Sequence, residues 1–576
     1  MPAINQFPQL KAADGSSNVN FLQAGAGAQV RSVQAKLRDI VSVKDFGAVG
    51  DGVVDDTAAI QAAIASNKPL DWLDGVYKHT GIDVSTTAIN WFSRGAKLLY
   101  SGTQKQFAVR VVLSPGQSSI QGQITSDGNL FAHVAWRIES NATALTPEAN
   151  LPSFYANGLV GINAKRISVA FQDGDGISIA GGFLTATLDN PVAKNCFMAT
   201  GAGVPGSEGI FGITFASLNS RRTKHISINN PYVENIWSED ALYKSDQDGI
   251  RIFQDLADTG ATCHINNYVC MNAANRCLKL HSAPNAIING VHRVKNSAVI
   301  PQSGAFTVSD IDAQQAHAII SNVRVIYDGA WHNVVIRAAI DVGSNQFGGS
   351  CVNNVSLYCA NTTVDQITVV SASRDVTPSS IVQRFTASNI THTGDRILQL
   401  ASITGSTGGS SLFSLSNLIG TVGVAGVGLS ARGNVKGSIV GLINNGLNTA
   451  VWAAISNEET LDLEASAVSG FSFPCYLQES TIVSGAVRVR GNSFSALRLD
   501  TEGGAATDDL DTIDNGSSGQ VIVLFTSVNA RDVLVKHNTG NIQLTGGVDF
   551  NLTSVDKKIA LMWTETISKW VELYRV

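Results

Sequence analysis

The sequence predicts an all-β protein whose central part is a parallel β-helix, and a repeated pair of short segments leads to this prediction. The first segment begins with an aliphatic residue followed by Asn or Gly and ends on Asn; it occurs at 188–195, 228–235, 265–272 and 288–296. Shorter copies continue to residue 418, and successive central residues lie 23 to 40 residues apart. A repeat of this length indicates a solenoid, in which each turn of chain packs on its neighbours.

The second segment alternates with the first and combines a polar residue with a short strand, at 175–179, 208–213, 248–253 and 276–281. Aliphatic residues at every second position indicate strands, and recurrent Asn and Gly supply the positive φ that tight corners require. Strands of neighbouring turns then stack at about 4.8 Å, so that equivalent residues form columns along the coil.

Residues 41–66 precede the repeats and predict a strand, a Gly-Asp-Gly turn and a single amphipathic helix. Asp55, Asp56 or Thr57 can cap that helix. A helix at this place would cover the first turn of the coil, whose backbone groups would otherwise be open to pairing with another strand. Residues 1–42 are irregular and are expected to be a connector or docking segment.

Composition argues against several classes of protein. A net charge of −6 gives no reason to expect nucleic acid, no run of 18 apolar residues indicates membrane insertion, and the N-terminus lacks the pattern of a signal peptide. Seven cysteines without a CxxC motif indicate free buried thiols, as in a protein folded in the cytoplasm. No cofactor or metal is expected, because the histidines lie on different predicted turns.

The stretch VSVKDFGAVGDGVVDDTAAIQAAI at 41–64, preceded by a connector that begins FLQAG, resembles the opening of the pectate-lyase-like β-helices of bacteriophage tailspikes. The resemblance covers residues 21–66, and the later repeats agree with it in pattern. It implies a right-handed parallel β-helix that assembles as a homotrimer and that binds and degrades bacterial capsular polysaccharide, such as the capsules of Klebsiella. It also implies a place in the phage tail of the virion after synthesis in the host cytoplasm. Because the long N-terminal anchor of some tailspikes is missing, attachment through another phage tail protein is expected.

Three domains are expected. Residues 1–42 form the N-terminal segment for virion docking, and residues 43–500 form the catalytic β-helix. Residues 505–576 form a C-terminal, antiparallel β-sandwich-like domain for trimerisation or carbohydrate binding. Between about 420 and 500 the Gly-rich sequence leaves the end of the β-helix undetermined.

Stacking of the second segment is expected to bring charged residues together. Asp175, Glu208, Asp248 and Arg276 are predicted to share one position on successive turns, with Arg251 and Lys279 sharing another; the loop at 236–247 adds acidic and aromatic residues beside them. The candidate catalytic residues are Asp248, Glu208, Glu239, Asp246, Asp175 and Asp240, and the candidate substrate-binding residues are Arg251, Arg276, Lys279, His281, Tyr243 and Trp237.

These residue types fit the cleavage of a glycan. Glycosidases use two carboxyl groups about 5–9.5 Å apart, one protonated and one ionised, and a neighbouring like charge raises the pKa of one of them. Hydrolysis by paired carboxylates, with Asp248 central, is the preferred hypothesis. Three alternatives stay open: β-elimination at a uronic acid whose charge is neutralised by cations, a binding-only adhesin in which the acids serve turns, and a secreted pectinase-like enzyme, which the missing export signal disfavours.

Overall fold

A computed structural model describes residues 12–86, 88–168, 174–202, 209–239, 246–253, 261–281, 285–296, 306–314, 317–328, 334–343, 350–360, 367–373, 383–395, 397–404, 411–420, 422–432, 435–444, 451–454, 461–466, 476–489, 495–516 and 519–576. The chain divides into two compact units, Met1–Ala316 with Asp328–Val335, and His317–Tyr327 with Ile336–Val576. In the described residues, no helix is long and apolar enough to cross a membrane.

The first unit begins with short elements ahead of the coil. After the 3-10 helix η1 (Gly15–Asn18), β1 (Asn20–Leu22) pairs antiparallel with β2 (Val30–Ser32), and α2 (Val33–Leu37) follows directly. Ser32 Oγ accepts a hydrogen bond of 3.0 Å from a backbone N–H in the first turn of α2, and this bond caps the helix. β3 (Val41–Ser42) and the 3-10 helix η2 (Val43–Phe46) lead into the coil.

The predicted helix at the start of the coil is present as α3 (Thr57–Ala65). The strand expected ahead of the Gly-Asp-Gly turn is limited to β3, because residues 43–46 form η2, and β4 (Asp51–Asp55) begins inside the predicted turn. Asp56 is buried between β4 and α3, and its carboxylate accepts hydrogen bonds of 2.7 Å from Val49 N and 3.1 Å from Gly50 N. This carboxylate therefore holds the glycine turn in place rather than capping α3 with its side chain.

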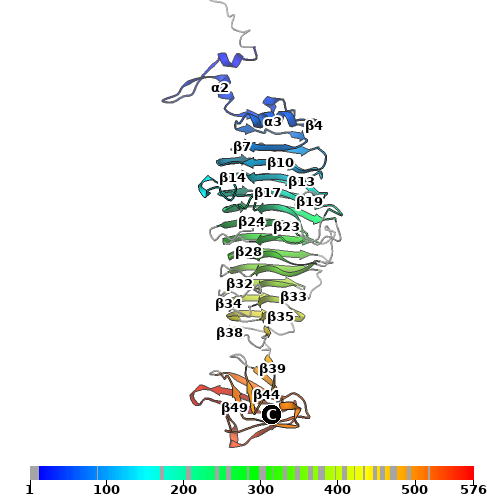
Figure 1. Ribbon diagram of the computed structural model, residues 1–576, viewed down its shortest axis with the longest axis vertical. Helices are drawn as coiled ribbons and strands as arrows, with labels where there is room; N and C mark the ends of the chain where they lie inside the picture. The colour runs from blue at the N-terminus through cyan, green and yellow to red at the C-terminus, as the bar shows by residue number, and fades with distance from the viewer. Residues whose placement is uncertain are drawn as a thin grey trace, which may run out of the picture. The chain divides into compact units, whose positions relative to one another are not determined.

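Three rows of parallel strands build the coil of the first unit, in which successive turns lie one below another (Figure 1). The first row contains β5 (Leu70–Asp71), β8 (Asn90–Phe92), β11 (Gln117–Gln121), β14 (Ser153–Asn157), β18 (Thr185–Asp189) and β21 (His225–Asn229). The second row contains β4, β6 (Val76–His79), β9 (Ala96–Tyr100), β12 (Ile124–Asp127), β15 (Leu159–Ile162), β16 (Lys165–Arg166), β19 (Val192–Met198) and β22 (Tyr232–Ser238). β24 (Thr262–Ala273) and β26 (Asn285–Asn296) continue both rows without a break.

The third row contains β7 (Ile82–Thr86), β10 (Lys105–Leu113), β13 (Ala132–Ser140), β17 (Gly174–Ala180), β20 (Ile210–Ala216), β23 (Gln247–Phe253), β25 (Leu278–His281) and β27 (Phe306–Gln314). Each full turn thus passes through one strand of each row, as β18, β19 and β20 do. The parallel β-helix predicted from the sequence is confirmed.

An Asn stands at the corner between the first and second rows. Asn190, Asn230 and Asn267 have φ values of 51°, 51° and 54°, and Gly290 takes the same corner one turn later with a φ of 76°. The side-chain amides also bond along the coil, since Asn230 donates to Asn190 at 3.0 Å and accepts from Asn267 at 3.1 Å. The residue type therefore serves both the left-handed corner and the stacking of turns.

The interior of the coil is filled mainly by the aliphatic positions of these strands. Leu188 and Ile228, which are register partners in β18 and β21, are fully buried. Gly249 in β23 also faces this interior, because a Cβ added there would lie 2.1 Å from Tyr268 Oη. The alternation of a strand then turns the preceding residue, Asp248, away from the interior.

The second unit contains further parallel turns of the same kind. One set of strands is β28 (His317–Asp328), β30 (Ser350–Ala360), β32 (Gln383–Gly394), β34 (Ser411–Gly420), β36 (Val435–Asn444) and β38 (Leu461–Ser466). The other set is β29 (Val334–Gly343), β31 (Thr368–Ser373), β33 (Ile397–Thr404), β35 (Val422–Arg432) and β37 (Val451–Ala454). The Gly-rich stretch that the sequence left undetermined therefore contains turns of the coil.

A β domain of mixed strand direction follows. Its strands are β39 (Tyr476–Thr481), β40 (Ala486–Arg488), β41 (Ser495–Asp500), β42 (Thr507–Leu510), β43 (Thr512–Asp514), β44 (Val521–Thr526), β45 (Asp532–Val535), β46 (Ile542–Gln543), β47 (Phe550–Leu552), β48 (Ile559–Thr564) and β49 (Lys569–Arg575). The 3-10 helices η4 (Glu502–Gly504), η5 (Thr545–Gly547) and η6 (Glu565–Ile567) lie between them.

The predicted antiparallel pairing holds for β44, β48 and β49, but β39, β41 and β44 pair in parallel. One apolar cluster joins Ile482 and Leu497 to Trp570, so the domain includes residues ahead of the predicted boundary at 505. The predicted start of this domain at 505 is too late, because β39 and β41 have the same alternating pattern as strands of the coil.

We expect Asn230→Ala to destabilise the protein more than Asn230→Gly. Both variants lose the amide hydrogen bonds of Asn230, but Gly accepts a positive φ freely, whereas a left-handed Ala costs about 1 kcal/mol. The measurement is the apparent Tm at one heating rate, because large β proteins often unfold irreversibly. Equal Tm values for the two variants would contradict the role given to the corner φ.

Candidate active site

Register between the turns of the third row decides which side chains meet. Arg251 in β23 lies beside Lys279 in β25, as predicted. Asp248 lies beside Phe211 of β20, and Phe211 in turn lies beside Asp175 of β17. The predicted column of carboxylates on adjacent turns is therefore wrong at its second position, where an aromatic ring separates two acids.

Three predicted site residues, Glu208, Asp240 and Tyr243, lie outside the described residues. The position assigned to Glu208 belongs to Phe211, three residues later, because Phe211 is the register partner of both Asp175 and Asp248. Asp175 remains two turns from Asp248, about 10 Å along the coil, and its Oδ1 accepts a hydrogen bond of 3.0 Å from Thr214 Oγ1.

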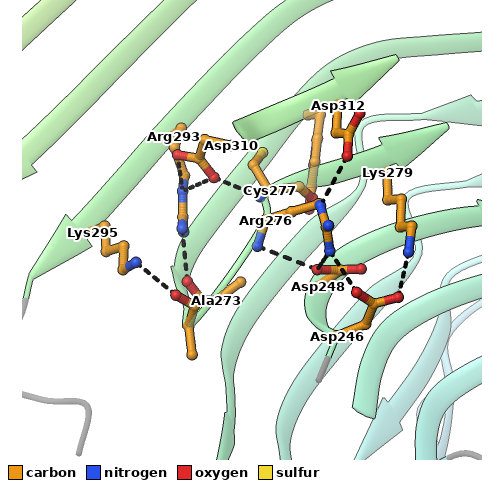
Figure 2. Close-up of polar contacts among 12 residues, drawn as sticks. Asp246, Asp248, Ala273, Arg276, Cys277, Lys279, Arg293, Lys295, Asp310 and Asp312 are labelled. Atoms are coloured by element: carbon orange, nitrogen blue, oxygen red, sulfur yellow. Dashed lines mark hydrogen bonds and ion pairs between the residues drawn. The ribbon is translucent and has the colours of Figure 1, made fainter. Parts of the chain in front are cut away.

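Arg276 lies at the centre of a cluster of three carboxylates (Figure 2). Its Nη1 is 2.6 Å from Asp246 Oδ1 and 3.4 Å from Asp248 Oδ1, and its Nε is 3.1 Å from Asp312 Oδ2. The backbone N of Arg276 also donates to Asp248 Oδ1 at 3.3 Å. Lys279 Nζ forms an ion pair with the second oxygen of Asp246. One guanidinium thus joins two acids of the turn before it, Asp246 and Asp248, to Asp312 of the turn after it.

Asp246 and Asp248 contact the same nitrogen of Arg276. Because both contact the same Nη1 of Arg276, their nearest oxygens lie at most about 6 Å apart. The Asp246 side chain retains 19% of its exposure and that of Asp248 retains none. Asp246 is therefore the member that reaches solvent, and Asp248 lies behind it.

Electrostatics separates the two acids. Burial, together with the charge of Asp246, raises the pKa of Asp248 to about 6, against the pull of Arg276. Burial also opposes ionisation of Asp246, but Arg276 and Lys279 outweigh it and hold its pKa well below the usual range. Asp248 Oδ2 has no hydrogen-bond partner among the described residues. The pair thus combines Asp246, whose pKa is lowered, with Asp248, whose pKa of about 6 keeps it protonated in mildly acidic solution.

Cationic and aromatic side chains continue the cluster along β23 and β25. The Arg251 guanidinium lies 4.4 Å from the ring centre of Phe211 and 4.5 Å from that of Phe253. The Phe253 ring lies 5.8 Å from that of His281. Burial, followed by the charges of Lys279 and Arg276, lowers the pKa of His281 to about 3, so this imidazole is neutral at physiological pH.

The remaining predicted residues lie on the second row. Glu239 follows β22 and forms an ion pair of 2.8 Å with Lys165. Trp237 of β22 packs edge-on against Phe197 of β19 with ring centres 5.0 Å apart. Trp237 thus belongs to the second row and Glu239 follows it, whereas Asp248 belongs to the third row, so the predicted candidates lie on two rows of strands.

Sequence reasoning missed three participants in the cluster. Asp312 lies beside Lys279 in register, and Phe211 and Phe253 flank Arg251. The alternating pattern of SDIDAQ at 309–314 could have predicted the place of Asp312. Ile311 takes the position of Leu278, which puts Asp312 beside Lys279. The segment begins with Ser instead of a charged residue and therefore did not match the repeat.

A second cluster of charged residues binds the backbone just before β25 (Figure 2). Arg293 and Asp310 are fully buried and pair at 3.0 Å, and Asp310 Oδ1 accepts a hydrogen bond of 2.6 Å from Cys277 N. Lys295, also buried, donates to Ala274 O at 2.6 Å. Consecutive N–H groups at the start of β25, those of Arg276 and Cys277, are thus bound by carboxylates from the turns on either side.

The described residues contain free cysteines but no cluster suited to a metal ion. Each of the six described cysteines is a free thiol, five of them buried. Within the described part of the chain, no group of three or more His, Cys, Asp or Glu residues has the arrangement of a metal site.

Comparisons with known proteins agree with the opening segment. Residues 40–135 match the family described as Rhamnogalacturonase A/epimerase, pectate lyase-like. The tail spike protein of an Escherichia phage is 48% identical over 64 residues, which are 11% of this chain and 8% of that protein. The resemblance predicted from the opening segment is confirmed. The matched segment is a small part of that relative, so the match does not show that the two proteins share a function.

Solved structures with a partial likeness include two phage proteins. Tailspike protein 3 of bacteriophage CBA120 is 10% identical with a TM-score of 0.42, over 98% of this chain and 74% of that one. The tailspike protein of E. coli bacteriophage HK620, solved in complex with a pentasaccharide, is 13% identical with a TM-score of 0.32, over 92% of this chain and 87% of that one. The fold assignment rests on the strand pairings themselves.

We expect Asp248→Asn to remove part of the pH dependence of stability. The pKa of Asp248 is about 6 in the folded protein against 3.8 as the ordinary value, so the folded state binds this proton more tightly. Its contribution to stability is full below the unfolded pKa and is lost as the pH rises through about 6. Asp246, whose pKa is lowered, acts in the opposite sense: its contribution to stability is full above the unfolded pKa and is lost only as the solution becomes more acidic.

The measurement is the denaturant midpoint between pH 4 and pH 8 for both proteins. The midpoint of the wild type should fall over this range more steeply than that of Asp248→Asn. Asp127→Asn is the control, because Asp127 lies outside the cluster and pairs with Lys97 at 2.7 Å. Parallel curves for the wild type and Asp248→Asn would contradict the assignment of a protonated Asp248.

Proposed function

We propose that this protein is a phage tailspike that binds host capsular polysaccharide and cleaves it as a glycoside hydrolase. The observation that carries the chemistry is the Asp246–Asp248 pair at the start of β23, in which the pKa of Asp246 is lowered and that of Asp248 is raised. The opening shared with a phage tail spike protein and the match to a pectate lyase-like family support the substrate class.

Hydrolysis of a glycosidic bond requires an acid that protonates the leaving oxygen and a carboxylate that attacks or activates water. Asp248 suits the acid, because its pKa is raised and its Oδ2 has no hydrogen-bond partner among the described residues. Asp246, ionised and nearer to solvent, suits the carboxylate. Their separation of at most about 6 Å fits the roughly 5–5.5 Å of retaining enzymes better than the wider spacing of inverting ones. Net retention of the anomeric configuration follows.

A second candidate reaction is β-elimination at a uronic acid. Arg251, Arg276 and Lys279 supply the positive charge that would neutralise a substrate carboxylate, and His281 is a neutral imidazole whose Nε2 has no partner among the described residues. Two of these cations are already engaged by Asp246, however. This engagement favours hydrolysis.

We also propose that the protein acts as a homotrimer attached to another phage tail protein by its N-terminal elements. Leu22, Val30 and Leu37 there are 61%, 61% and 68% exposed, and such apolar side chains are suited to burial in a partner. A molar mass near 60.6 kDa by light scattering would contradict the trimer.

The central experiment exposes purified capsular polysaccharides from a panel of bacterial strains to the protein. Falling viscosity and new reducing ends are expected on at least one capsule, without the ultraviolet absorption of a new C=C bond. NMR of the first products should show retained configuration. Ultraviolet absorption would instead identify a lyase, and retention of a polysaccharide without cleavage would identify an adhesin.

Asp246→Asn and Asp248→Asn are expected to lower the cleavage rate by about 10²–10⁴, because each removes an acid or base function. Asp127→Asn is the matched control: its carboxylate accepts hydrogen bonds of 2.9 Å from Asn129 N and from Asn163 Nδ2, so that variant should lose stability but keep its rate per folded molecule. Full cleavage rates for both cluster variants, with unchanged Tm, would place the catalytic residues elsewhere.

A further inference from the structure

A column of side chains on the second row stands apart from the acid pair. Lys165 of β16 lies beside Phe197 of β19, and Phe197 lies beside Trp237 of β22. The residues that flank Phe197, Cys196 and Met198, are fully buried. The alternation of the strand therefore turns the column away from the interior of the coil.

The two aromatic rings of this column are only partly buried. Phe197 and Trp237 meet edge to face, with ring centres 5.0 Å apart and planes at 67°. The large aromatic side chains of the interior, such as Trp136 and Phe154, are instead at most 1% exposed. The pair thus presents aromatic surface to solvent on two successive turns.

An ion pair borders the aromatic surface. Lys165 Nζ and Glu239 Oε1 are 2.8 Å apart, with side chains 20% and 36% exposed. Lys165 and Glu239 belong to the turns on either side of Phe197, so the ion pair spans the turn that contains this ring. Thr200 Oγ1 lies 3.3 Å from Glu239 O and adds a hydroxyl at the same edge. Donors and acceptors therefore accompany the apolar surface.

We propose that Phe197, Trp237, Lys165 and Glu239 form a saccharide-binding subsite that holds one sugar ring of the polysaccharide. A pyranose ring has an apolar face of C–H groups and a rim of hydroxyls. Aromatic side chains with a few fixed polar groups match both features. In this arrangement Lys165 donates to the rim and Glu239 accepts from it, so Glu239 serves binding and not the chemical step.

The position of the subsite links it to the acid pair. Trp237 and Glu239 stand where the chain leaves β22, and Asp246 stands where it enters β23. A hydrogen bond of 2.8 Å from Ser238 N to Gln247 Oε1 joins the two ends of this connection. The inference rests on the proposed function, since a polymer long enough to reach both places is held at the subsite while it is cut at the acid pair.

The test compares Trp237→Ala and Phe197→Ala with Tyr232→Ala. Tyr232 is a half-buried aromatic residue on the same strand as Trp237, where it packs under Lys194 at 4.4 Å. The probe is the capsular polysaccharide that the wild type cleaves, together with the oligosaccharides released from it. Both subsite variants should raise KM and the Kd for the oligosaccharides about tenfold and leave kcat within about threefold. Tyr232→Ala should change neither.

If a truncated aromatic variant folds poorly, substitutions at the partly exposed Lys165 and Glu239 test the subsite instead. Lys165→Met and Glu239→Gln remove the polar edge while keeping side-chain volume, and each should raise KM severalfold with kcat retained. Unchanged KM and Kd in these variants would overturn the subsite. A large loss of kcat in Glu239→Gln at constant Kd would make Glu239 catalytic and would overturn its assigned role.

Failure of this inference is distinguishable from failure of the proposed function. A wild type that neither retains nor cleaves any capsule in the panel contradicts the proposed function. A wild type that cleaves a capsule, accompanied by subsite variants with wild-type KM and Kd, contradicts the subsite alone.

Discussion

Stacking of each turn of chain directly on the previous one is the constraint on which the rest of the structure depends. Parallel pairing keeps a residue beside its equivalent, as in the succession of Asp189, Asn229 and Asn266, whose side chains bond at 2.7 and 2.9 Å. A corner can pass through this stack only with the same backbone conformation at every turn. Asn meets that demand at Asn190 and Asn230 because it tolerates a positive φ and bonds to its own equivalents.

The same stacking determines the electrostatics of the candidate site. Arg276 contacts Asp248 from the turn before it and Asp312 from the turn after it, and all three are almost wholly buried. Buried charges are tolerated when they are paired, and loss of one member leaves its partners uncompensated. The protonation of Asp248 is therefore a property of several turns together and not of its own strand.

Several site residues were predictable because they depend on the period of the repeat. Arg251 and Lys279 follow the alternation of aliphatic residues, and their register is as predicted. Phe211 was missed because the segment was aligned on Glu208 and Gly209, three residues before the Phe211 and Gly212 that occupy this position. The ion pair of Lys165 with Glu239 joins residues 74 positions apart, and no local pattern carries information about such a contact.

The sequence by itself determined the parallel coil, its Asn corners and the helix α3 at its start, because each follows from local periodicity and backbone preference. The tertiary structure alone decided which of two neighbouring acids has the raised pKa. Asp246 and Asp248 are the same residue type on one short segment, and only burial and the placement of Arg276 and Lys279 move their pKa values apart. Those quantities come into existence when the turns stack, since desolvation and ion pairing depend on neighbours distant in the chain.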